Sequence, residues 1–99
     1  LTLRPHSLVN RVLYDEQQGR AVGVELVDTE TNEVIEYYAK IIFLNAATLA
    51  TAFILLNSTS NRFPNGLGNG SDQVGRNIMD HHKGAGANAS VDGFLYQYY

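Results

Sequence analysis

The chain has 99 residues, a length that allows one small domain at most. Its formal net charge is -3, and its few Lys and Arg residues form neither a basic cluster for nucleic acid nor a cationic face for an anionic membrane. It has no cysteine, which excludes disulfides and thiolate metal sites. No apolar run approaches the length of a membrane span.

The first 40 residues predict an antiparallel β-meander. Three hydrophobic segments are separated by short polar turns, which is the pattern of strands joined by tight connections. In the second segment Val22, Val24 and Leu26 fall on one face, as expected for a half-buried strand. The expected strands cover residues 7–14, 20–28 and 34–39.

Residues 41–57 predict a buried strand that leads into a helix. Ile41–Leu44 is a continuous apolar run without alternation, typical of a strand covered on both faces in a parallel sheet. The residues that follow favour a buried helix with Thr48 as its N-cap. Ala46 and Ala47 stand at the turn between the two, where small side chains let the backbone approach a ligand. We therefore expect this turn to be the place where a ligand comes close.

The second half of the chain predicts a loop and an extended segment. Residues 58–73 are rich in Asn, Ser and Gly, as in a surface loop with a functional or mobile role, and residues 74–99 begin an extended segment. Asp80, His81 and His82 form the most reactive-looking cluster. Adjacent histidines on a strand point to opposite faces, and a metal site needs three or four converging ligands. We therefore assign no metal ligand and no catalytic residue.

The two ends of the chain favour an internal piece of a longer polypeptide. The sequence starts without Met, and it ends on a run rich in aromatic residues with no polar tail. Such an end would be a sticky surface if it were exposed. The alternative is a stand-alone β-rich module without catalysis, whose strand edges and terminal tyrosines recruit a partner.

Two stretches of the sequence resemble one enzyme family. Residues 8–47 contain, in order, Leu-Val-Asn-Arg-Val-Leu-Tyr, Ala-Val-Gly-Val-Glu and Ala-Lys-Ile-Ile-Phe-Leu-Asn-Ala-Ala. Residues 74–81 read Val-Gly-Arg-Asn-Ile-Met-Asp-His. In order and spacing they resemble the glucose-methanol-choline (GMC) oxidoreductases, whose members have a V-x-R-I strand, a V-G-V strand, a Ser-Ala-Gly-like turn and a G-x-N-L-x-D-H motif.

The resemblance implies an α+β fragment of a FAD-binding, Rossmann-like α/β domain. The parent enzyme would oxidise an alcohol, sugar or polyol by passing a hydride to the flavin, and this segment would contact the remainder of the same polypeptide. Val9 is similar in position to the family valine whose backbone contacts the adenine end of FAD. Ala46 and Ala47 match the turn that passes close to the dinucleotide, and Asn77 and Asp80 lie in a motif near the cofactor.

The sequence also departs from the family pattern. It lacks the G-x-G-x-x-G turn that cradles the pyrophosphate and the histidine pair that handles the substrate proton. Ala47 replaces the usual glycine, and Asn-Ser-Thr-Ser at residues 57–60 replaces the family's S-G-I-G. We therefore expect the isolated chain to bind no FAD and to be inactive. Its unpaired apolar strand favours self-association, and nothing in the sequence indicates a compartment.

Overall fold

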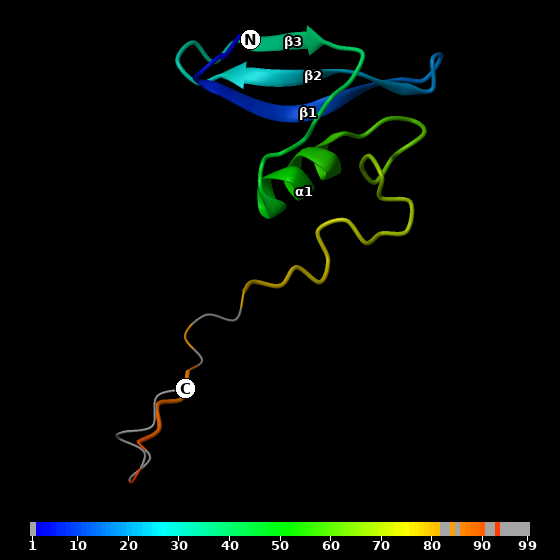
Figure 1. The fold of residues 1–99 in the computed structure, drawn as a ribbon. Helices are drawn as coiled ribbons and strands as arrows, with labels where there is room; N and C mark the ends of the chain where they lie inside the picture. The colour runs from blue at the N-terminus through cyan, green and yellow to red at the C-terminus, as the bar shows by residue number, and fades with distance from the viewer. Residues whose placement is uncertain (1, 82–83, 85, 91–92, 94–99) are drawn as a thin grey trace.

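The computed structural model of the chain contains a three-stranded antiparallel sheet with a helix beside it (Figure 1). The structure describes residues 2–81, 84, 86–90 and 93. The predicted meander is confirmed, and its middle strand has the bounds that the alternation predicts. The strands lie in the order β1 (Ser7–Asp15), β2 (Arg20–Asp28) and β3 (Val34–Tyr38), and the helix is α1 (Thr48–Asn57).

The turns of the meander are set by aspartates. The Asp15 carboxylate accepts hydrogen bonds from the backbone N–H groups of Gln17 and Gln18, at 2.8 and 2.9 Å. Gly19 then closes the turn with a φ of 66°, a left-handed conformation that glycine adopts at low cost. Asp28 accepts from two following N–H groups in the same way after β2. These local bonds fix where each strand ends.

A β-bulge at Asn10 decides which side chains of β1 face the helix. Val9 lies opposite Leu26 and Val12 lies opposite Val24, so β1 uses one residue more than β2 over the same stretch. In a regular strand Val9 and Val12 would point to opposite faces, because side chains alternate. The bulge turns both toward the same face of the sheet.

The hydrophobic core lies where α1 packs against β1. Val12 and Leu26 of the sheet and Ile54 of the helix are buried, and α1 contacts no other described strand. The prediction of a buried helix is therefore correct for one side only. On its other side Leu49 and Phe53 keep 69% and 57% of their surface exposed.

Residues 41–44 do not form the predicted strand within this chain. This segment runs without regular structure from the end of β3 to the start of α1 (Figure 1). No described strand lies beside it, and the backbone of residues 40–46 makes no hydrogen bond with another described residue. Its side chains still alternate, since Ile42 and Leu44 are half-buried while Ile41 and Phe43 are 72% and 80% exposed. The segment has the side-chain pattern of a strand but lacks the neighbour that would form a ladder.

The helix begins one residue earlier than the capping pattern predicts. Ala47 is the N-cap, because its carbonyl accepts the first helical hydrogen bond from the Thr51 N–H at 2.9 Å. Thr48 is the first helical residue, and the helix has no side-chain cap. Ala47 has φ 64° and ψ 168°, a conformation that is almost restricted to glycine.

The loop after the helix is held at several points. The Glu16 carboxylate accepts from the backbone N–H and from the amide of Asn61, at 2.8 and 3.3 Å. The Phe63 ring meets Tyr14 edge to face with centroids 5.0 Å apart. Asn69 is buried, and both ends of its amide hydrogen-bond within the loop. The loop is therefore pinned to the β1–β2 hairpin by side-chain contacts.

Beyond the loop the chain leads away from the sheet and the helix (Figure 1). The described residues of the predicted extended segment contain no assigned strand. Across the described ranges, no helix has the length and apolar character needed to cross a membrane.

Candidate functional site

Two neighbouring hollows bring together residues that are far apart in the sequence. One, of about 240 Å³, lies between β1 and the start of α1, and the other, of about 380 Å³, lies between the sheet and the segment that leads to the helix. Val9, Ala46 and Ile54 line both hollows. The structure thus places together two of the five predicted cofactor-binding residues, one from β1 and one from the turn before α1.

The lining of these hollows is mostly apolar. Val24 contributes from β2, and Asn45 supplies the one side-chain amide of the second hollow. No charged side chain lines either of them. Such a surface holds a flat ring by excluding water and by close contact. These residues therefore fit the apolar part of a dinucleotide, and they offer no cation to its phosphates.

The other predicted residues lie apart from this pair. Ala47 is exposed at the helix start and lines neither hollow. Asn77 and Asp80 are also exposed, beyond the pinned loop, and neither lines the hollows. The one hydrogen bond of the Asp80 side chain among the described residues is accepted from the His81 N–H, at 2.7 Å. His82, the third residue of that cluster, lies outside the described residues.

Sequence reasoning missed a buried serine behind the hollows. The Ser58 side chain accepts a hydrogen bond from the Val12 N–H at 2.8 Å and donates one to the Ile54 carbonyl at 2.6 Å. Only 3% of Ser58 is exposed. The sole signal in the sequence is the replacement of the family's S-G-I-G, because the partner on β1 is distant along the chain.

A polar network supports the bulge from the opposite side. Arg11 donates to one oxygen of Glu25 through Nε and Nη2, at 3.0 and 2.6 Å, and the Asn10 amide donates to the other oxygen at 2.9 Å. The hydrogen bond from Arg11, followed by that from Asn10, holds the pKa of Glu25 below its usual value. The Asn57 amide of α1 approaches the carbonyl and the side-chain oxygen of Asn10, at 3.4 and 3.2 Å. The bulge is thereby tied to both β2 and the helix.

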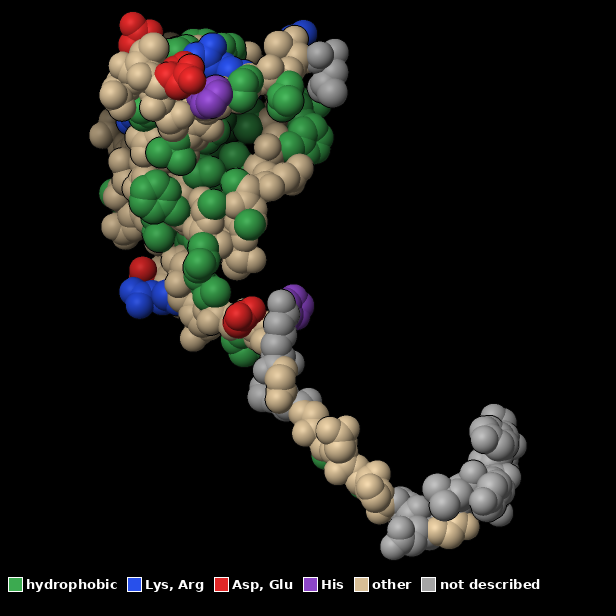
Figure 2. Space-filling model, turned by 90° about the vertical axis from the view of Figure 1, so that its left-hand side faces the viewer, with side chains coloured by type: hydrophobic (Ala, Val, Ile, Leu, Met, Phe, Trp, Pro, Cys, Tyr) green, Lys and Arg blue, Asp and Glu red, His purple; other side chains and the backbone are tan. Residues whose placement is uncertain are grey.

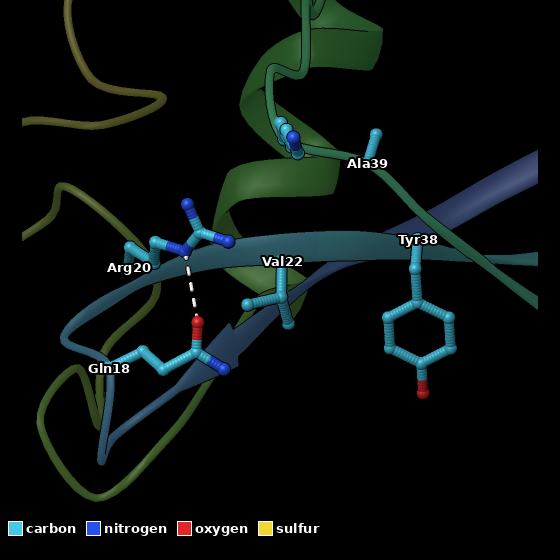
Figure 3. Close-up of a pocket in the computed structure, with 6 residues that line it drawn as sticks. Gln18, Arg20, Val22, Tyr38 and Ala39 are labelled. Carbon is cyan, nitrogen blue, oxygen red and sulfur yellow. Dashed lines mark hydrogen bonds between the residues drawn. The ribbon is translucent and has the colours of Figure 1, made fainter.

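A further open hollow of about 350 Å³ lies where β2 begins and β3 ends (Figure 3). There Gln18 accepts a hydrogen bond from Arg20 Nε at 3.2 Å, and Tyr38 and Ala39 form the opposite side. It shares no lining residue with the Val9–Ala46 hollows. It contains none of the predicted site residues.

Several large hydrophobic side chains are exposed on the surface of the described residues. Figure 2 shows hydrophobic side chains spread over one face, between a charged rim and the chain that leads away. Among the large hydrophobic side chains with most of their surface exposed are Leu3, Ile41, Phe43, Leu49 and Met79. A surface of this kind usually has a partner.

Comparisons with known proteins place the chain in a family. Residues 1–83 match the family model described as GMC oxidoreductase. The chain is 34% identical over 79 residues to 2-methyl-1,2-propanediol dehydrogenase from Mycolicibacterium austroafricanum, an alignment that covers 80% of this chain and 14% of that protein. No solved structure gives a significant match. The matched stretch includes all the residues predicted from the resemblance, and the chain belongs to the GMC oxidoreductase family.

Proposed function

We propose that this chain forms part of the scaffold that holds FAD in a longer flavin-dependent enzyme that oxidises an alcohol. The observation that carries the proposal is the meeting of Val9 and Ala46 in the same apolar hollows. Membership of the family and the name of the relative, a diol dehydrogenase, support the same reading. A small alcohol, sugar or polyol is the substrate class that we propose for the whole protein.

The role of the residues in the hollows is binding and not catalysis. Val9, Ala46 and Ile54 would surround the adenine end of FAD and exclude water from it. Bound FAD supplies the acceptor for the hydride that leaves the alcohol carbon. The described residues that line the hollows contain no group able to take the hydroxyl proton. The acid–base groups and the phosphate-binding turn would come from the remainder of the polypeptide.

The segment at residues 41–44 becomes a strand in this proposal. Its backbone groups are free among the described residues, and its side chains are apolar on both sides. A neighbouring parallel strand from the remainder of the polypeptide would satisfy those groups and bury both faces. The strand followed by α1 would then form one unit of a Rossmann-like sheet.

The proposal is tested by filling the hollows in the full reading frame that encodes this chain. Ala46→Leu places a larger side chain where both hollows meet, so FAD binding should weaken at least tenfold while the protein stays folded. Ala39→Leu is the matched control, because Ala39 is exposed and lines only the distant hollow of Figure 3. Flavin fluorescence quenching measures both. Equal affinity in the two variants would contradict the proposed site.

The 99-residue chain alone should behave differently from the longer protein. Without a cation at the hollows it should retain no yellow flavin once free FAD is removed, and its exposed Ile41 and Phe43 should drive self-association. Equilibrium sedimentation with and without FAD measures both properties. Flavin binding with micromolar affinity by a folded monomer would show that the chain is a complete binding module in its own right.

A further inference from the structure

We propose that Ser58 is a positioning residue that fixes the two walls of the cofactor hollows relative to each other. This inference rests on the proposed function. It assigns to Ser58, assisted by Asn57, the task of holding α1 at a set distance from the bulged strand β1. Neither residue touches the ligand, and both act through the residues that do.

The bonds of Ser58 reach one wall directly and the other through the strand. Its hydroxyl donates to the carbonyl of Ile54, a residue that lines both hollows. The same hydroxyl accepts from the N–H of Val12, which shares a face of the sheet with Val9 because of the bulge. With 3% of its surface exposed, Ser58 has little water to replace either bond. One buried hydroxyl thus connects the helix wall to the strand wall.

Asn57 adds a second, weaker connection at the bulge itself. Its amide lies 3.2 Å from the side-chain oxygen of Asn10, the residue beside Val9. Asn10 in turn donates to Glu25, which Arg11 holds in place. These contacts hold the bulge in place from both sides. The bulge in turn fixes the backbone of the neighbouring Val9.

This connection is a property of the present sequence and not of the family motif. The motif has glycine where this chain has Ser58, and glycine has no hydroxyl to place between the helix and β1. The φ of Ser58 is -80°, a conformation open to any residue, so the backbone does not require glycine there. This chain therefore has a hydroxyl at a position from which it bonds both to α1 and to β1.

The test compares Ser58→Ala with Ser58→Thr in the full reading frame. Removing the hydroxyl should raise the FAD dissociation constant about tenfold, because a buried N–H of β1 loses its partner and the walls move apart. Threonine keeps a hydroxyl and should restore most of the affinity. Amide hydrogen exchange at Val12 should quicken in the alanine variant alone. The control is Ser60→Ala, which removes a loop hydrogen bond from the Phe63 N–H and touches neither hollow.

The outcomes separate this inference from the proposed function. If the unaltered full-length protein binds no flavin, the proposed function fails. If it binds flavin and Ser58→Ala binds equally well, with a loss of stability only, then Ser58 is merely structural and the inference is overturned. If Ser58→Ala does not fold, Asn57→Ala replaces it, and a rise of about twofold in the dissociation constant is expected. An unchanged constant in that variant also overturns the inference.

Discussion

The β1–β2 hairpin and the segment at residues 41–47 are both rich in hydrophobic residues, yet only the hairpin forms regular structure. The hairpin forms a ladder of backbone hydrogen bonds that is interrupted at two register shifts, and its turn is closed by Asp15 and Gly19. Residues 41–46 of the segment form none with the described residues, and Phe43 is 80% exposed. A hairpin contains both partners of its ladder within a short stretch, whereas an apolar run of this kind depends on strands elsewhere.

The difference teaches what an apolar pattern can and cannot specify. Hydrophobicity sets which side chains leave water, but a strand exists only if its backbone groups find partners. Three pairs of substitutions test this contrast, and their expected effects decrease in the order core volume, helix start and acid response.

Removing core volume should have the largest effect. Leu26→Ala empties space in the only part of the described chain where sheet and helix side chains are buried together, and should lower the free energy of unfolding by about 3 kcal/mol. Phe43→Ala removes a larger side chain that is 80% exposed and should change it by less than about 0.5 kcal/mol. Urea denaturation of the chain measures both. A large loss from Phe43→Ala would mean that the segment is packed in solution.

Relieving the backbone at the helix start should have an intermediate effect of opposite sign. Ala47→Gly removes a side chain from a conformation that is almost restricted to glycine, and should stabilise the protein by about 1 kcal/mol. Ala46→Gly is the matched control. Its φ is not positive, so glycine there should destabilise by about 0.5 kcal/mol. Thermal unfolding distinguishes the two, and destabilisation by both would show that Ala47 is not strained.

Acid should have the smallest effect, through Glu25. Its pKa is lowered in the folded state, so its contribution to stability is fully present above the unfolded value of about 4.3 and is lost as the pH falls through the lowered pKa. Asp28 acts in the same direction, because the N–H groups of Glu30 and Thr31 lower its pKa.

The Glu25 contribution is measured by urea midpoints between pH 5 and pH 2.5, a range chosen around the reference carboxyl value of about 4. Glu25→Gln should reduce the acid-induced loss of stability by about 0.5 kcal/mol. Glu33→Gln should leave the loss unchanged, since the Glu33 side chain has no hydrogen bond or ion pair among the described residues. If the urea midpoints of the two variants change equally with pH, then Glu25 does not contribute to the acid-induced loss of stability.

The meander could be predicted because its signals are local. The alternation of hydrophobic residues predicted both ends of β2 correctly. The aspartate and glycine turns predicted the ends of β1 and β3 to within one residue. The bulge at Asn10 was not predicted, since an extra residue in one strand becomes visible only in its register with the other. That one residue decides that Val9 faces the helix.

The site could be predicted in part and by resemblance only. Val9 and Ala46 were named from the family pattern, and the structure places them together. The role of Ser58 could not be found, because the bond that joins it to β1 spans 46 residues along the chain. The strand expected at Ile41–Leu44 does not form, since no described strand pairs with this segment. The family assignment does not depend on that strand, because it rests on the sequence comparison.

Because of the Ser58 hydroxyl, the two edge strands of the sheet, β1 and β3, differ in the backbone groups that they leave free. On the outer edge of β1 the Val12 N–H is hydrogen-bonded to Ser58, while no described segment pairs with the outer edge of β3. Sheets that join edge to edge need free groups on both partners. Edge-to-edge pairing between two copies is therefore favoured at β3 over β1, where the Val12 N–H is no longer available to a second chain.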